Sequence, residues 1–230
     1  MQSNPAPNTF ASGLAAAVPI AIGYFPIAFS FGVAATRAGL SVSEAVLLSA
    51  VVFAGAAQFL ALALITGGAS LWVAAVTLVA MNLRHVLYAP ALLKRAGPAA
   101  STRHAWGWSF ALTDEVFGAA LGALARGRVF SEPFMFGLGF GAYASWVAGT
   151  AVGALAGGAA LAAWPVLDAA LGFMLPALFL ALLLSILSAR QVPVIVVAAG
   201  VTAAVSLIVP GTPGLLCGMV AGAVTGVVRR

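Results

Sequence analysis

The chain of 230 residues has very few charged side chains: 7% are Asp, Glu, Lys or Arg, whereas 63% of all residues are hydrophobic. A soluble domain carries about 25% charged residues, so this chain cannot cover a water-facing surface. The composition excludes a soluble enzyme, a disordered chain and a secreted disulfide scaffold. Continuous apolar runs of about 20 residues also argue against a β-barrel, whose strands alternate apolar and polar residues. The sequence therefore predicts an all-α, polytopic membrane protein embedded in a lipid bilayer.

Other absences narrow the function. The single cysteine, Cys217, permits neither an intrachain disulfide nor a thiol metal site, and we expect no metal ion and no cofactor. The sequence has no GxSxG, HExxH or Walker A pattern, so we expect neither a hydrolase nor an ATP-using enzyme. The net charge of +5 lies mostly in short loops between apolar runs. Basic loop residues of this kind mark the cytoplasmic side of a membrane protein and do not indicate nucleic-acid binding.

Eight apolar runs are long enough to be membrane segments. The fourth run carries Asp114 and Glu115 in its middle, so its insertion into lipid is the least favourable of the eight. The sequence thus predicts one integral membrane domain over residues 1–230. We expect a helix bundle with seven or eight membrane segments, some of them broken or re-entrant. The runs cover residues 11–35, 45–65, 71–93, 105–124, 133–155, 169–187, 192–209 and 215–228.

The loop charges test the number of crossings. Eight full crossings would divide the basic loop residues five against four between the two membrane faces. If the fourth run instead re-enters, or another segment makes a half-crossing, all nine loop charges lie on one face. The positive-inside rule is strong for short loops. We therefore expect an odd effective number of crossings, with the N-terminus outside and the C-terminus in the cytoplasm.

Glycines and prolines recur at telling positions in the apolar runs. Glycines four residues apart let helix backbones approach closely; these glycine ladders predict tight packing within one bundle or, for one ladder, docking of a separate membrane subunit. Pro26 and Pro176 lie in two similar stretches, residues 22–29 and 171–179. They predict kinked or broken helices, which transporters often place near the substrate site. The ladders are Gly149, Gly153 and Gly157; Gly218, Gly222 and Gly226; Gly118 with Gly122; and Gly137 with Gly141.

Polar side chains inside apolar runs are the candidate transport residues. An ionisable group at the centre of a membrane helix costs about 2.5–3.5 kcal/mol and persists where it finds a partner. Arg84 could bind a substrate carboxylate or an internal acid, or it could snorkel to the cytoplasmic boundary. Asn82 shares a helix face with His85, which could relay protons or have a structural role. Gln58 is buried in an apolar run beside Gly55, where small residues leave room for a neighbouring backbone or a ligand.

The two adjacent acids, Asp114 and Glu115, point to different faces of a helix. If one of them pairs with Arg84, the other is free to bind a substrate ammonium or to carry a coupling proton. The alternative is an interfacial turn in which Thr113 or Asp114 caps a helix and both acids touch water. The interfacial turn would also fit a re-entrant fourth segment.

Five features occur in a fixed order along the chain: FAGAAQF at residues 53–59, NLRHVLY at 82–88, LTDEVF at 112–117, Trp146, and LGFMLPALF at 171–179. Together they resemble the large subunit of the azaleucine-resistance (AzlC-type) family of branched-chain amino acid exporters. The resemblance covers nearly the whole chain. The family usually has serine where this chain has Ala57, so a hydroxyl group is not essential there.

The resemblance implies a secondary transporter of the bacterial inner membrane that exports L-valine, leucine and isoleucine, with methionine as a further candidate. It also implies coupling to the proton gradient and a small AzlD-type membrane subunit of about four spans. The residue chemistry agrees, because Arg84 and Asn82 could bind a carboxylate and Asp114 or Glu115 an ammonium. The alternatives are a passive channel or facilitator for small solutes, and an assembly subunit whose partner performs transport. The ionisable groups in apolar runs argue against the assembly subunit.

Overall fold

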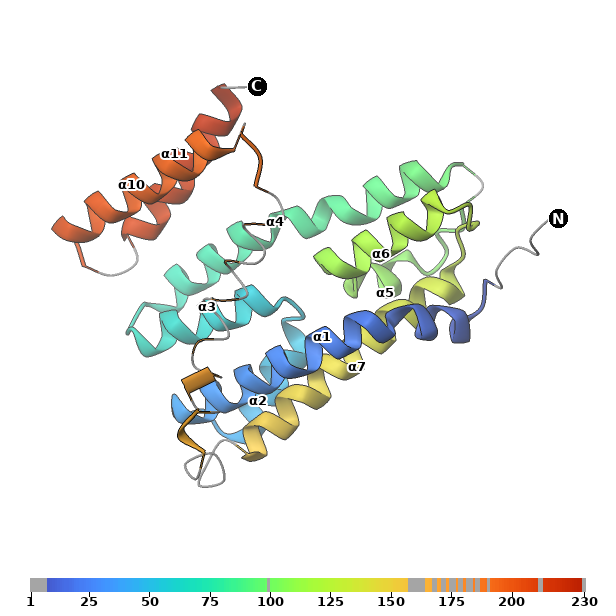
Figure 1. Cartoon of the computed structure of the whole chain (residues 1–230), viewed down its shortest axis with the longest axis horizontal. Helices are drawn as coiled ribbons and strands as arrows, with labels where there is room; N and C mark the ends of the chain where they lie inside the picture. Colours follow the sequence, from blue (N-terminus) through green and yellow to red (C-terminus); the bar gives the residue numbers. More distant parts are fainter. Residues whose placement is uncertain are drawn as a thin grey trace. The chain divides into compact units, whose positions relative to one another are not determined.

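Every regular element in the described part of the chain is an α-helix (Figure 1), which confirms the predicted all-α class. The computed structural model describes residues 8–98, 100–156, 164–166, 169–170, 173, 177, 180, 184, 187–189, 191–210 and 213–228. The helices are α1 (Phe10–Arg37), α2 (Val42–Val51), α3 (Gly55–Thr66), α4 (Leu71–Ala96), α5 (Ala105–Phe110), α6 (Asp114–Ala125), α7 (Glu132–Ala156), α10 (Val192–Ile208) and α11 (Pro213–Val228).

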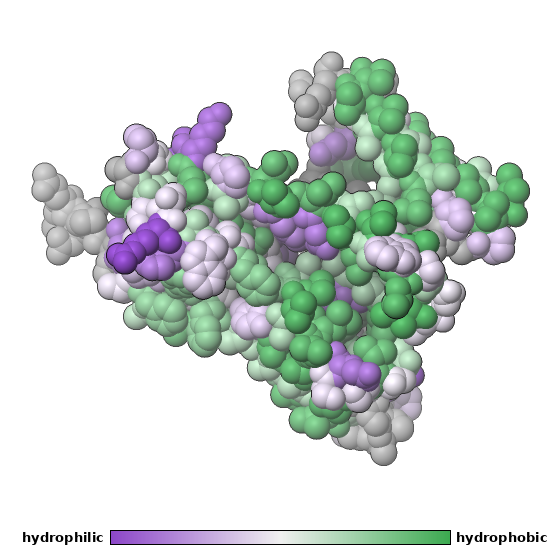
Figure 2. Space-filling view, turned by 180° about the vertical axis from the view of Figure 1, so that it is seen from behind, coloured by the Kyte–Doolittle hydropathy of each residue, from purple (hydrophilic) through white to green (hydrophobic). Residues whose placement is uncertain are grey.

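Three of these helices, α1, α4 and α7, are long and apolar enough to cross a membrane alone, with 28, 26 and 25 residues. Four shorter helices, α2, α3, α10 and α11, are also apolar. Large apolar side chains stand on the surface, as at Trp72 on α4 and Leu207 on α10, which are 82% and 88% exposed. Figure 2 shows a mostly hydrophobic face on which hydrophilic side chains gather in a few clusters. The predicted polytopic membrane bundle is confirmed.

Local signals explain where α1 and α2 begin. The Thr9 hydroxyl accepts a hydrogen bond from the Ser12 backbone N–H at 3.3 Å, and the Ser12 side chain returns a bond to the cap. Ser41 and Glu44 form the same reciprocal cap at the start of α2. Such caps satisfy backbone N–H groups that have no partner inside the helix. Helix α1 ends before Gly39, whose φ of +94° lies in the left-handed region that glycine adopts without strain.

Two of the eight predicted runs are each divided into two helices. The run at residues 45–65 contains α2 and α3, separated by residues 52–54. The fourth run contains α5 and α6, separated by residues 111–113. Helix α1, in contrast, continues without interruption through Pro26, so the prediction of a broken helix there is wrong. A proline removes one hydrogen bond from the helix, and packing against a neighbouring membrane helix tolerates that loss. Pro176 lies outside the described residues.

The chain divides into two compact units, Met1–Leu60 with Val79–Met174, and Ala61–Leu78 with Leu175–Arg230. In the first unit α1 and α7 lie side by side along their lengths (Figure 1) and make the most extensive helix contact there. Glycines allow this close approach. A Cβ atom at Gly149 would lie 2.6 Å from the Phe25 carbonyl oxygen, and one at Gly153 would overlap the Phe29 carbonyl.

Of the other ladders, some contact a neighbouring helix and one faces open space. Gly137 meets the backbone of α1 at Phe10, and Gly218 on α11 packs against Thr202 of α10 in the second unit. A Cβ at Gly118 on α6, however, would have no atom within 4 Å in the described structure. Most of the ladders therefore serve helix packing within the chain, which was one of the two predicted roles; the other was docking of a separate membrane subunit. Gly157 lies outside the described residues.

Candidate functional site

The first turn of α6 positions the two candidate acids. The side chain of Thr113, the N-cap residue, accepts a hydrogen bond from the Val116 backbone N–H at 3.3 Å. Asp114 and Glu115 follow as the first two residues of the helix. The partial positive charge of a helix N-terminus favours carboxylates at this position. The cap that the sequence suggested is present, and it places two acids in the break between α5 and α6.

Helix α4 is fastened to α6 through Asp114. An Arg84 guanidinium nitrogen lies 2.7 Å from one carboxylate oxygen of Asp114, and the Tyr88 hydroxyl donates a hydrogen bond to the other oxygen. The Tyr88 ring stacks on Phe117, with 4.5 Å between the ring centroids, and the His85 ring meets Tyr88 edge-on at 5.2 Å. Arg84 lies near the middle of α4, one of the three helices long enough to span. Of the alternatives for Arg84, the pairing with an internal acid is therefore present.

Glu115 has a different environment from Asp114. Its carboxylate accepts a hydrogen bond from the hydroxyl of Tyr24 on α1, and this hydroxyl also lies 2.6 Å from the Thr113 Oγ1 atom. A phenol has one proton and a carboxylate can only accept, so the Thr113 hydroxyl supplies the proton for the second bond. Among the described residues, Glu115 forms no ion pair. Asp114 is thus neutralised by a cation, whereas Glu115 is held by a phenol.

Tyr24 connects the two helix breaks. Its hydroxyl reaches the start of α6, as described above, and its ring meets Phe53, which lies in the break between α2 and α3, at 6.1 Å. The ring also meets Trp146 of α7 edge-on at 5.2 Å. Tyr24 is buried. Tyr24 is not among the candidate residues predicted from the sequence, where its only signal is a phenol hydroxyl within an apolar run.

Gln58 holds the break between α2 and α3. Its amide nitrogen lies 2.6 Å from the Val52 carbonyl oxygen and 3.1 Å from the Ser49 Oγ atom, and it donates to both. Its amide oxygen accepts from the Trp146 indole N–H at 3.0 Å. Gly55 starts α3 against the same indole, where a Cβ atom would lie 2.5 Å from a ring carbon. The amide of the fully buried Gln58 therefore already has protein partners on both its nitrogen and its oxygen.

Replacing Gln58 with leucine is expected to destabilise the protein strongly. The substitution removes the partner of the Trp146 N–H and one donor to the Val52 carbonyl, and each unsatisfied buried group costs about 1–3 kcal/mol. We expect lower abundance in membranes and a lower unfolding temperature in detergent. Gln191→Leu is the matched control, because the Gln191 side chain bonds to Ser188 three residues away. Equal unfolding temperatures for Gln58→Leu and the unaltered protein would contradict this account.

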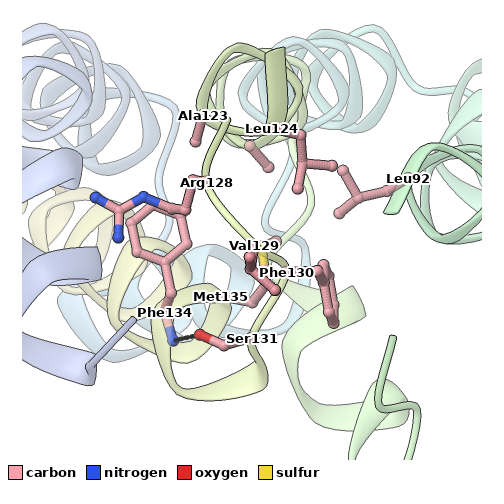
Figure 3. A pocket seen from close by; sticks show the side chains of 10 residues that line it. Leu92, Ala123, Leu124, Arg128, Val129, Phe130, Ser131, Phe134 and Met135 are labelled. Carbon is pink, nitrogen blue, oxygen red and sulfur yellow. Dashed lines mark hydrogen bonds between the residues drawn. The ribbon is translucent and has the colours of Figure 1, made fainter. Parts of the chain in front are cut away.

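A small cavity between α6 and α7 is no candidate for substrate binding (Figure 3). Its volume is about 10 Å³, which is close to the minimum that holds one water molecule. The guanidinium of Arg128 lies over the Phe134 ring, 4.3 Å from its centroid, and the Ser131 hydroxyl accepts from the Phe134 N–H at 3.4 Å. These contacts fix the turn that enters α7.

A larger hollow lies beside Glu115. Its volume is about 290 Å³. Five of its lining residues come from one face of α1, and the sixth is Glu115 from the first turn of α6. The wall is thus largely apolar, with one carboxylate and one phenol at its side. The lining residues are Pro19, Ile20, Gly23, Tyr24, Ile27 and Glu115.

The structure brings together only some of the residues that the sequence singled out. Arg84, Asp114 and His85 gather around Tyr88, and Glu115 follows next on α6. Asn82 lies on α4, two residues before Arg84. The remaining pair, Gln58 and Gly55, lies at the other helix break and contacts Trp146. The cluster at α6 and the network at Gln58 are therefore separate, and Tyr24 reaches both through its hydroxyl and its ring.

Comparison with known proteins places this geometry in a family. A family model described as AzlC protein matches residues 19–160, a range that contains Tyr24, both helix breaks and the Arg84–Asp114 pair. The inner membrane protein YgaZ of Escherichia coli (strain K12) is 43% identical over 99% of this chain and 94% of its own length. An uncharacterized membrane protein of Archaeoglobus fulgidus is 38% identical over 93% of this chain and 92% of its own. No solved structure gives a significant match. The chain therefore belongs to the AzlC family of membrane transporters.

Proposed function

We propose that the chain is the large subunit of a secondary exporter for branched-chain amino acids in the bacterial inner membrane. The substrates would be L-valine, leucine and isoleucine, with methionine as a further one. The observation that supports this function best is the arrangement at the start of α6. There an arginine–aspartate pair is followed in the chain by a second carboxylate, Glu115, which lines a hollow with largely apolar walls.

This arrangement offers one group for each part of an aliphatic amino acid. The substrate carboxylate needs a cation, and the Arg84 side chain is 52% exposed although it pairs with Asp114, so part of its guanidinium can bind a second anion. The substrate ammonium needs an anion, which Glu115 provides. The bond from Tyr88 keeps Asp114 in place while Arg84 interacts with substrate. The apolar wall of α1 can accept the hydrocarbon side chain.

Coupling, partner and orientation belong to the same proposal. We propose that the proton gradient drives export and that one of the two acids, or His85 beside Tyr88, carries the proton. We also propose that a small AzlD-type subunit of about four spans completes the transporter, and that the C-terminus is cytoplasmic.

A reporter fused after Arg230 tests the orientation of the C-terminus. We expect the reporter to be in the cytoplasm, and periplasmic activity of the reporter would contradict this orientation.

The function is tested by counterflow in liposomes that contain the chain together with a small AzlD-type membrane subunit. We expect saturable uptake of labelled valine into liposomes preloaded with valine, with competition by leucine and isoleucine but not by lysine or glutamate. Liposomes without protein give the background. Uptake that rises linearly with concentration would favour a passive facilitator, and no uptake above background would contradict amino acid transport.

A further inference from the structure

We propose that the hollow beside Glu115 is the subsite for the ammonium group and aliphatic side chain of the substrate, and that Gly23 sets the largest side chain that fits. The inference rests on the proposed transport of amino acids and adds a location and a specificity-determining residue. Three observations support this subsite: the volume and lining of the hollow, the absence of an ion pair at Glu115 among the described residues, and the open space at Gly23.

The hollow has the size and the lining of a site for a small apolar solute. Its volume of about 290 Å³ lies just below the range of about 300–1,000 Å³ that holds drug-sized ligands, as suits a smaller molecule. Pro19, Gly23 and Ile27 are four residues apart along α1, so they form one continuous strip on the helix. Ile20 borders this strip, and Glu115 closes one side. A small molecule bound here would contact hydrocarbon along α1 and a carboxylate at one end.

Glu115 determines which kind of molecule the hollow can hold. A carboxylate loses hydration when an apolar molecule covers it, and this loss is costly unless a cation or a donor replaces the water. A lipid tail offers neither. An ammonium group offers both, because its N–H groups form short, charge-assisted hydrogen bonds with carboxylates. The occupant that fits is therefore a molecule with an ammonium group next to a hydrocarbon chain.

Gly23 is open on the side of the hollow. A Cβ atom at Gly23 would have no described atom within 4 Å apart from its own turn of helix. Two other glycines of α1 differ, because a Cβ at Gly13 would overlap the Phe134 carbonyl and one at Gly32 would overlap the Thr150 carbonyl, both on α7. Close helix packing thus explains Gly13 and Gly32 but not Gly23. The missing side chain at Gly23 leaves volume in the hollow, and a larger residue there would occupy it.

The test is a size series at position 23 in the reconstituted complex. Gly23→Ala and Gly23→Val are compared with the unaltered protein by the concentrations of alanine, valine and leucine that halve the counterflow of labelled valine. One methylene in a hydrophobic pocket changes discrimination between substrates by about 10–200-fold. We therefore expect Gly23→Val to raise the half-inhibitory concentrations of leucine and valine by about tenfold or more. The value for alanine, which fills less of the hollow, should change by less than about threefold. Gly23→Ala should weaken leucine more than valine.

Gly200→Val is the matched control, because Gly200 is also an exposed helical glycine whose Cβ would have no described neighbour within 4 Å. It should leave all three values unchanged. Equal weakening of the three amino acids by the Gly23 variants, or no weakening, would overturn the subsite. If Gly23→Val does not fold, the leucine-to-valine ratio of Gly23→Ala decides the question. A lack of saturable valine counterflow in the unaltered complex would instead overturn the proposed function, and the subsite with it.

Discussion

Replacing Gly153 with valine is expected to prevent the first unit from folding. Gly153 lies where α7 packs directly against the backbone of α1, and even a Cβ atom would overlap the carbonyl group of Phe29. Extra methylenes in a packed core usually cost about 1–3 kcal/mol when side chains can move aside. Here the obstacle is backbone, so the two helices must separate, and we expect a cost above about 3 kcal/mol.

The measurement is protein abundance in membranes together with the unfolding temperature in detergent. Gly118→Val is the control, because Gly118 is a helical glycine with no described atom within 4 Å of a Cβ; it should change neither quantity strongly. Gly153→Ala should give an intermediate loss. If Gly153→Val is as abundant and as stable as the control variant, α1 and α7 do not approach each other as described.

A second large effect is expected at the Arg84–Asp114 pair. Arg84→Gln and Asp114→Asn should each lower abundance and abolish valine counterflow. Asp114→Asn leaves Arg84 without this carboxylate in α4, a helix long enough to span the membrane, and Arg84→Gln leaves Asp114 without this cation at the start of α6. A lone charge costs about 2.5–3.5 kcal/mol at the centre of a membrane helix. The double variant removes both charges. We therefore expect it to recover abundance but not counterflow, because the cation for the substrate carboxylate is still missing.

Lys94→Gln is the control for the loss of a cation from α4. Lys94 lies in the last turn of that helix, where a basic side chain can reach the membrane boundary, and we expect near-normal abundance and counterflow. Full counterflow in the double variant would show that Arg84 does not bind substrate. Normal abundance of both single variants would show that the pair lies in water and not in the membrane interior.

The part of the site that depends on local sequence was predictable. The Thr113 cap and the two acids that follow it are neighbours in the chain, so their sequence pattern indicated the start of α6. The high cost of lone charges in apolar runs made an internal acid one candidate partner of Arg84, beside a substrate carboxylate, and the structure decides for Asp114. The helical membrane class followed from the low charge and the long apolar runs.

The break between α2 and α3 was not predictable in the same way. No proline and no capping residue lies at residues 52–54. The break is stabilised by contacts from a distant part of the chain, where Trp146 donates to Gln58 and Thr150 bonds to Ser49 at 2.7 Å. A pattern of neighbouring residues cannot report such contacts. Pro26 predicted a kinked or broken helix, whereas α1 is continuous there. The reason is related, because groups that surround a membrane helix can satisfy the backbone carbonyl that a proline leaves free.

The glycine contacts between α1 and α7 also limit which motions the first unit can make. Carbonyl groups of one helix lie in the gaps left by glycines of the other, as at Gly13, Gly149 and Gly153, so sliding along the helix axes would drive backbone into backbone. These two helices should therefore move as one rigid body. Hinge motion is left to residues 52–54 and 111–113, where helices are already interrupted. Tyr24, which belongs to this rigid pair, contacts Phe53 in one interruption and Thr113 in the other, so either hinge would move against the same side chain.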